Sequence, residues 1–128
     1  MPIHKNENIL DSNRQLKVGK LFQEELAEAF RKWASEEFPG NIISVTEVKV
    51  TPDLSVAKIY VSIFPNTRKE EILKEIRTNT PLFRGVLSKG AAKKMRITPE
   101  LIFKLDNSLD EIEKIDNALK GKGNNPIL

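Results

Sequence analysis

Residues 42–64 read IISVTEVKVTPDLSVAKIYVSIF, two apolar runs on either side of the turn sequence Thr-Pro-Asp. The second run has an apolar residue at every second position, as is typical of a strand with one buried face. In the first run the apolar positions change phase half-way along, which indicates an extra residue in the strand. The pattern therefore predicts a β-hairpin of strands 42–50 and 56–64, with a bulge near Thr46-Glu47.

A long amphipathic helix is predicted before the hairpin. Asp11 or Ser12 supplies a side chain that can cap the start of this helix, and Phe38-Pro39-Gly40 ends it. Between these points the apolar residues recur at spacings of three and four, as one buried face of a helix requires. These residues are Val18, Leu21, Phe22, Leu26, Ala29, Phe30 and Trp33.

Two helices joined by a sharp kink are predicted after the hairpin. Thr67-Arg-Lys-Glu70 has the form of a capping box for the first of them. At Asn79-Thr80-Pro81, Asn tolerates the left-handed conformation at a helix end, Thr can cap the next helix and Pro suits its first position. We expect the second helix to continue to about Met95, followed by a strand over residues 98–105.

These elements describe one α+β domain in the order αββααβ, with a three-stranded sheet covered by helices on one face. A chain of 128 residues has the length of one domain and can bury a core. We expect a flexible leader at 1–11, the domain at 12–105, a C-terminal helix at 106–120 packed on or near the domain, and a flexible tail at 121–128. The C-terminal helix opens on a second capping box, Ser108-Leu-Asp-Glu111.

The composition excludes several classes of protein. The absence of cysteine excludes a disulfide framework and any thiol-based metal or redox site. No window approaches the roughly 20 apolar residues of a membrane span, and the N-terminus lacks the apolar run of a secretory signal. We therefore expect a cytoplasmic protein with no membrane partner. The net charge is only +3, so the distribution of the charges is more informative than their sum.

The segment 84–96 is strongly basic and contains no Asp or Glu. Its cations are Arg84, Lys89, Lys93, Lys94 and Arg96. On a helix Lys89, Lys93 and Arg96 would share one face, because they are spaced by four and three. Any soluble helix has a charged outer face, but such faces normally mix both signs. A run of cations alone favours a polyanion, and the segment therefore predicts binding to the phosphates of a nucleic acid.

A second, weaker basic cluster lies on the first turns of the first helix. It consists of Arg14, Lys17 and Lys20, whose spacing of three and three keeps them roughly together. We interpret this cluster as support for the first basic site. Most of the aromatic residues fit the core better than a base-stacking surface, so the sequence favours recognition of RNA backbone and shape. The aromatic residues expected in the core are Phe22, Phe30, Trp33, Phe83 and Phe103.

The sequence offers no catalytic apparatus. The only histidine, His4, lies in the predicted leader, so no Ser-His or metal-His site is expected on the folded domain. Gly85-Val-Leu-Ser-Lys-Gly90 superficially resembles a phosphate loop, but its lysine precedes the second glycine and no Ser or Thr follows. Residues 106–110 lack the twelve-residue loop of a calcium site. We therefore expect no enzymatic activity, no metal and no cofactor.

Three stretches of the chain resemble the ribosome-binding factor A family, a group of bacterial maturation factors of the small ribosomal subunit. The stretches are residues 14–30, 48–62 and 95–109, and the last of them is the most specific. The resemblance implies a type II KH-like fold. The family lacks the Gly-x-x-Gly loop of ordinary KH domains and has an Ala-x-Gly kink between two helices. In this chain the kink position holds Asn79-Thr80-Pro81.

The resemblance also implies a function and a site. It implies a monomer that binds the immature small ribosomal subunit through its rRNA and assists late maturation and 5′-end processing of that rRNA, without nuclease activity of its own. The family's basic surface falls on the cations of segment 84–96, supported by those of the first helix.

The residues themselves leave two other functions open. One is a general KH-type RNA-binding module, and competition by unrelated RNA at moderate salt would support it. The other is a protein-interaction module whose basic helix meets an acidic partner, which would show a weak dependence on salt.

Overall fold

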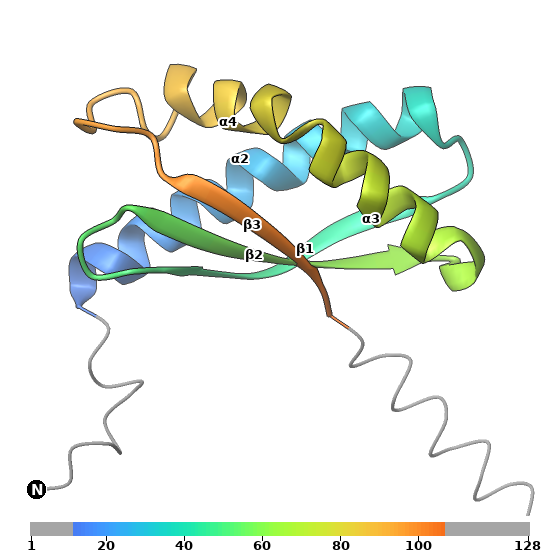
Figure 1. The fold of residues 1–128 in the computed structure, drawn as a ribbon, viewed down its shortest axis with the longest axis horizontal. Helices are drawn as coiled ribbons and strands as arrows, with labels where there is room; N and C mark the ends of the chain where they lie inside the picture. The colour runs from blue at the N-terminus through green and yellow to red at the C-terminus, as the bar shows by residue number, and fades with distance from the viewer. Residues whose placement is uncertain (1–11, 107–128) are drawn as a thin grey trace, which may run out of the picture.

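Figure 1 shows the computed structural model of the chain, in which residues 12–106 are described. This part of the chain has the predicted αββααβ order and the α+β, type II KH-like fold. Its elements are α2 (Asn13–Glu37), β1 (Ile42–Val50), β2 (Val56–Phe64), the 3₁₀ helix η1 (Asn66–Arg68), α3 (Lys69–Thr78), α4 (Thr80–Lys89) and β3 (Glu100–Leu105). The predicted leader and tail, and the C-terminal helix beyond its first residue, lie outside the described residues.

The sheet has the order β1-β2-β3 and confirms the predicted hairpin. β1 and β2 pair antiparallel, and their register shifts between Val45 and Glu47, where the bulge was expected. β3 pairs parallel to β2, which requires the long crossover that α3 and α4 provide. The hydroxyl of Thr46, the bulged residue, donates a 2.7 Å hydrogen bond to the Asp106 carboxylate. The bulge therefore contacts the chain where it leaves β3.

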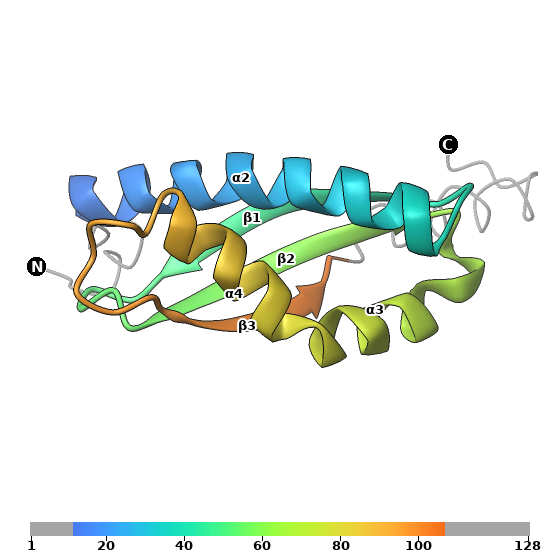
Figure 2. The same ribbon diagram turned by 90° about the horizontal axis from the view of Figure 1, so that it is seen from above.

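The three helices form a single layer over one face of the sheet. Figure 2 shows α2 running along β1, while α3 and α4 follow one another on the side of β3. None of the helices between residues 12 and 106 is long and apolar enough to cross a bilayer. Phe30 of α2 lies at the centre of the core, with its ring 4.5 Å from that of Phe83 and 5.9 Å from that of Phe103. These contacts confirm the predicted core, in which Phe22 is also buried and Trp33 is partly buried.

The start of α2 is held by local and tertiary hydrogen bonds. Ser12 caps the helix, since its hydroxyl accepts from the Gln15 N–H while the Gln15 side chain accepts from the Ser12 N–H. The buried Gln15 amide also donates 2.8 Å to the Val50 carbonyl and so ties α2 to β1. The predicted burial of Leu21 was wrong, because this side chain is 49% exposed. Leu21 lies about 100° around the helix from Phe22 and thus outside the core-facing arc.

The kink between α3 and α4 is confirmed, but the predicted capping was wrong. α3 begins after η1 with Arg68 at its cap position and no capping side chain, so Thr67-Arg-Lys-Glu70 forms no capping box. Asn79 has φ −97° and ψ 20°, which is not left-handed, and no side chain caps α4. The Thr80 hydroxyl instead donates to the Arg77 carbonyl, and Pro81 lies in the first turn of α4 as expected.

The largest difference from the sequence prediction is the length of α4. We expected this helix to reach about Met95, but it ends at Lys89 and residues 90–96 form turns and bends. The predicted common helical face of Lys89, Lys93 and Arg96 is therefore wrong. The reason is a tertiary contact at Ala91.

Candidate nucleic-acid interface

A hydrogen bond from α2 ends α4. The Glu25 carboxylate accepts a hydrogen bond of 2.9 Å from the N–H of Ala91, a residue 66 positions later in the chain. The Leu87 carbonyl accepts from both Gly90 and Ala92, at 3.0 and 2.8 Å. Gly90 lies so close to Glu25 that a Cβ on this residue would overlap the carboxylate. The chain therefore leaves the helix axis at Gly90.

We call residues 90–99 the basic loop. Its second end is held by Arg84 of α4, whose Nε donates 2.9 Å to the Pro99 carbonyl and whose Nη2 donates 2.6 Å to the Thr98 carbonyl. The basic loop is thus fastened by a carboxylate near its start and by a guanidinium near its end. Arg84, a predicted RNA-binding residue, already has a structural role in holding this loop.

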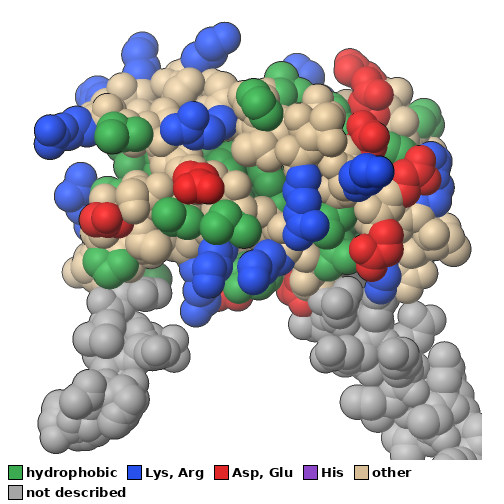
Figure 3. All heavy atoms as spheres, in the orientation of Figure 1, with side chains coloured by type: hydrophobic (Ala, Val, Ile, Leu, Met, Phe, Trp, Pro, Cys, Tyr) green, Lys and Arg blue, Asp and Glu red, His purple; other side chains and the backbone are tan. Residues whose placement is uncertain are grey.

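The cations of the basic loop are exposed and available. Lys93, Lys94 and Arg96 lie on the loop, and Lys89 is the last residue of α4. Within the described part of the chain, none of these four side chains has a hydrogen-bond or ion-pair partner. Lys and Arg side chains gather at the upper left of Figure 3, over the end of α4 and the loop that follows it. The buried Ala92 and the half-buried Met95 anchor this surface to the core.

The structure divides the second predicted cluster. Arg14, in the first turn of α2, lines a hollow together with Arg96 of the basic loop. Lys17 is exposed on α2, and the Lys20 ammonium lies 4.0 Å from the Glu24 carboxylate. Steps of three residues turn backwards by about 60° on a helix, so Lys20 faces about 120° away from Arg14. Only Arg14 is therefore brought together with the basic loop.

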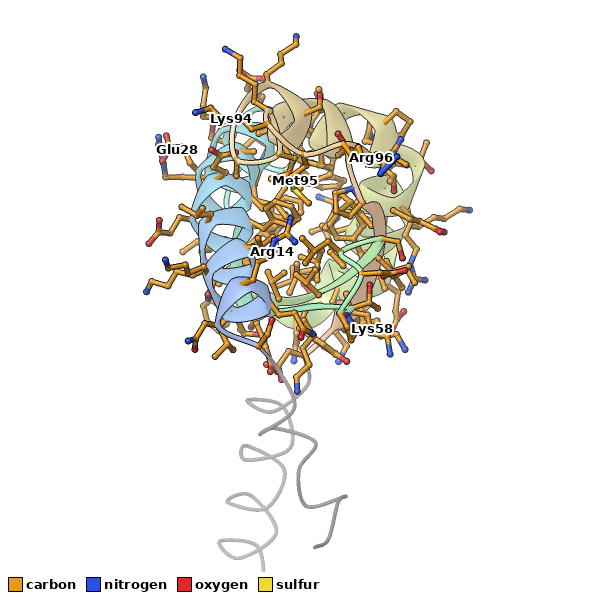
Figure 4. All side chains as sticks on the ribbon, turned by 90° about the vertical axis from the view of Figure 1, so that its left-hand side faces the viewer. Arg14, Glu28, Lys58, Lys94, Met95 and Arg96 are labelled. Atoms are coloured by element: carbon orange, nitrogen blue, oxygen red, sulfur yellow. The ribbon has the colours of Figure 1, made fainter. Side chains whose placement is uncertain are left out.

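The hollow has a volume of about 620 Å³ and lies at the end of the molecule shown in Figure 4. In that view Arg14 extends from α2 toward the middle, beneath Met95. Three parts of the chain form its walls: the first turn of α2, the basic loop and the turn between β1 and β2. Its lining residues are Arg14, Pro52, Asp53, Leu54, Ser55, Met95, Arg96 and Ile97.

The hollow was missed by the sequence analysis. The sequence predicted Met95 as the end of a helix, gave Ile97 no element, and indicated only a hairpin turn for the residues after β1. One signal was present: Ile97, an apolar residue directly after the run of cations. That signal gave no indication of which other segments lie beside it.

The kink residues lie away from the basic loop. Asn79, Thr80 and Pro81 are at the first end of α4, and the ten residues of this helix span about 15 Å. The Asn79 side-chain amide donates a hydrogen bond of 2.8 Å to the Glu75 carbonyl, so it satisfies a backbone acceptor near the end of α3. The kink and the basic loop are thus two separate surfaces.

Between residues 12 and 106 no three side chains of the metal-binding types Asp, Glu, His and Cys gather closely enough to hold a metal ion. Glu28 forms a hydrogen-bonded ion pair with Arg31, which lowers the pKa of the Glu28 carboxyl. A shallower hollow between α2 and α4 is lined by the carboxylates of Glu24, Glu25 and Glu28 and by the ammonium-bearing side chains of Lys32 and Lys89. Its three acidic and two basic groups make it a poorer site for a polyanion than the surface of the basic loop.

The fold and the site together define a type II KH-like domain with a cluster of free cations at one end. The chain belongs to the ribosome-binding factor A family, because the family model of that description matches residues 14–119. Ribosome-binding factor A of Flavobacterium johnsoniae is 44% identical over 119 residues, which is 92% of this chain and 91% of that protein. The same factor of Flavobacterium psychrophilum is 43% identical over equal shares of both chains.

Solved structures agree with the fold. The crystal structure of ribosome-binding factor A from Thermus thermophilus superposes with a TM-score of 0.59 at 21% identity, covering 71% of this chain and 94% of that one. A homology model of the factor from the same organism, fitted into the cryo-EM map of its complex with the 30S subunit, gives 0.55 at 22% identity. It covers 75% of this chain and 94% of that one. The family resemblance seen in the sequence is confirmed.

Proposed function

We propose that this protein is a non-catalytic assembly factor that binds the immature small ribosomal subunit through its rRNA. It acts as a monomer in the cytoplasm, and it assists late maturation of the rRNA and processing of its 5′ end. Family membership and the 30S complex described for a structural neighbour support this proposal. The observation that carries it is the set of four exposed cations at residues 89–96 with no protein partner in the described region.

These cations suit an rRNA backbone. Each phosphate contact releases counterions, so several cations on one surface give affinity without any contact to a base edge. We assign the contact to Lys89, Lys93, Lys94 and Arg96, with Arg14 beside them. Lys17, which the structure does not bring to the basic loop, contributes less, as do Arg84 and Lys20, which have partners within the protein, and the kink residues 79–81. Binding that is stronger to an immature arrangement than to the mature one would favour release as maturation proceeds.

Co-sedimentation with free small subunits, large subunits and intact ribosomes over a salt series tests the proposal. We expect selective binding to free small subunits that weakens steeply as salt is raised. Equal binding to all three particles would replace the proposal by a general RNA-binding module. Binding that survives ribonuclease treatment and depends little on salt would indicate a protein partner.

A pair of double variants tests the site. Lys89→Glu with Lys93→Glu should weaken small-subunit binding by at least about tenfold, because two phosphate contacts become repulsive. Lys74→Glu with Lys104→Glu changes the net charge equally at exposed positions on α3 and β3 and serves as the control. Equal losses in the two double variants would show that only net charge matters and would remove the site assignment.

A further inference from the structure

The arginine side chains point to a specific binding subsite. Four of the six arginines are used by the protein itself: Arg31 with Glu28, Arg68 with Glu71, Arg77 with the Phe103 carbonyl, and Arg84 with the Thr98 and Pro99 carbonyls. The other two, Arg14 and Arg96, have no partner among residues 12–106, and both line the 620 Å³ hollow. A guanidinium presents a planar fork of donors that matches a phosphate, so each of these two side chains can bind an anion at the hollow from its own side.

Arg14 lies at a position where a positive charge lowers the stability of α2. It lies in the first turn of α2, which contains no acidic residue. The positive end of the helix dipole disfavours a cation there. A bound phosphate would remove this repulsion and interact favourably with both the guanidinium and the helix end. The position of Arg14 therefore indicates an anionic ligand.

The walls of the hollow indicate that the ligand is more than an anion. Ile97 is 68% exposed, the highest value among the large apolar side chains of the described residues, and it lies next to Arg96. Half-buried Met95 and buried Leu54 add further apolar surface. A phosphate alone, or an acidic side chain of a protein, would make no favourable contact with these apolar groups. An unstacked base presents a flat apolar face together with a phosphate, and the volume lies within the roughly 300–1,000 Å³ of ligand pockets.

Asp53 gives the hollow one acceptor. Its Oδ1 accepts from the Thr51 hydroxyl at 2.9 Å, the Ser55 N–H at 3.1 Å and the Ser55 hydroxyl at 2.7 Å. The backbone N–H of Asp53 itself also donates to this carboxylate. These bonds lower the pKa of the carboxyl, so Asp53 is ionised at neutral pH. A carboxylate disfavours a second phosphate in the hollow but accepts from an amino or ring N–H of a base.

We propose that this hollow binds a single unstacked nucleotide of RNA. Arg14 and Arg96 bind its phosphate, Ile97 and Met95 cover one face of its base, and Asp53 Oδ2 accepts a hydrogen bond from a base N–H. The inference rests on the proposed function and extends it. The protein then holds one nucleotide of a single-stranded rRNA segment, in addition to the backbone contacts of the lysines.

NMR titration of the full chain with three small probes tests the subsite. The probes are GMP, guanosine and ribose 5-phosphate, and the signals are the Ile97 methyl groups and the Nε–H groups of Arg14 and Arg96. We expect GMP to shift all of these signals in one binding event, at least about tenfold more tightly than ribose 5-phosphate, since stacking a base is worth about 1–3 kcal/mol. Equal affinities for GMP and ribose 5-phosphate, or an unmoved Ile97, would overturn the nucleotide assignment.

Three variants assign the contacts. Arg96→Gln should weaken the binding of both GMP and ribose 5-phosphate, whereas Ile97→Ser should weaken the binding of GMP alone. Lys74→Gln, a matched loss of charge on α3 outside the hollow, should leave the affinities for both probes within about twofold of the wild-type values. All three positions are exposed, so the fold tolerates these changes. A loss with Lys74→Gln as large as that with Arg96→Gln would reduce the subsite to general charge attraction.

Co-sedimentation separates this inference from the proposed function. Small-subunit binding by a wild-type protein that fails to bind GMP at Ile97 would disprove the nucleotide subsite and leave the assembly-factor proposal standing. GMP binding in the hollow without any small-subunit binding would support the nucleotide subsite and disprove the assembly-factor proposal.

Discussion

The Glu25 carboxylate on α2 accepts a 2.9 Å hydrogen bond from the backbone N–H of Ala91, just beyond the end of α4. This bond connects the longest helix of the described residues to the start of the basic loop. Arg84 fastens the far end of the same loop through two backbone carbonyls. The cations proposed to bind RNA are therefore carried on a loop with two fixed ends, which limits the conformational entropy lost on binding.

Loss of the Glu25 bond should loosen the basic loop. We expect Glu25→Ala to lower the free energy of unfolding by about 1–2 kcal/mol, because removing a charged acceptor leaves a partly buried N–H unpaired. Urea denaturation measures this change. Glu24→Ala is the control, since its exposed pair with Lys20 is 4.0 Å long and contributes less than about 1 kcal/mol. Equal effects of the two variants would contradict the role of Glu25.

Substitution of Arg84 should mainly lower stability, whereas substitution of Arg96 should mainly weaken binding to small subunits. Arg84→Ala should cost about 1–3 kcal/mol of unfolding free energy, because its guanidinium donates to two carbonyls that hold the loop. Arg96→Ala should change stability by less than about 0.5 kcal/mol, because this side chain is exposed. Binding to small subunits should show the larger loss in Arg96→Ala. A stable Arg84→Ala variant with unchanged loop signals would be inconsistent with this division.

Two helical glycines allow a matched test of close packing. A Cβ at Gly19 of α2 would lie 3.0 Å from the Val48 carbonyl oxygen, whereas a Cβ at Gly85 of α4 would meet nothing within 4 Å. Alanine is favoured over glycine in a helix by about 1 kcal/mol. Gly85→Ala should therefore stabilise the protein by about 0.5–1 kcal/mol.

At Gly19 the close contact of a Cβ with the Val48 backbone oxygen outweighs that gain. Overpacking costs about 1–3 kcal/mol, so Gly19→Ala should lower the free energy of unfolding by about 1 kcal/mol after the helix preference is included. Thermal and urea midpoints of the two variants check the opposite signs. Stabilisation by both substitutions would mean that α2 can move away from β1 at little cost.

Asp53 should make the β1–β2 turn sensitive to acid. The Ser55 hydroxyl, the Thr51 hydroxyl and the Ser55 N–H, in that order, lower the pKa of this carboxyl below the ordinary 3.8. Because the folded pKa lies below the unfolded one, this stabilisation is complete above about pH 5 and is lost as the pH falls through the folded pKa. NMR titration should place the Asp53 pKa below 3.8, and Ser55→Ala should raise it. A wild-type carboxyl that titrates at or above 3.8 would refute the turn geometry.

Much of the fold could be predicted because its signals are local. Alternation of apolar residues depends only on the two-residue period of a strand, so the hairpin and its bulge between Val45 and Glu47 were readable from residues 42–64. The apolar face of α2 and the kink at Asn79-Thr80-Pro81 were equally local. The run of cations at 84–96 is a property of composition, and it indicated a polyanion site without any structure.

The end of α4 and the shape of the site depend on residues far apart in the chain. Residues 91–95, Ala-Ala-Lys-Lys-Met, all favour helix, and their local preferences differ by only tenths of a kcal/mol. Gly90 lowers the helix preference at this point by about 1 kcal/mol, and a hydrogen bond from Glu25, 66 positions before Ala91, holds the chain where it turns out of the helix. Packing of α2 beside the basic loop then brings Arg14 and Arg96 to one hollow, a proximity that no local pattern encodes. The sequence by itself thus determined the helices, the hairpin and the sign of the site's charge, and tertiary contacts determined where those charges meet.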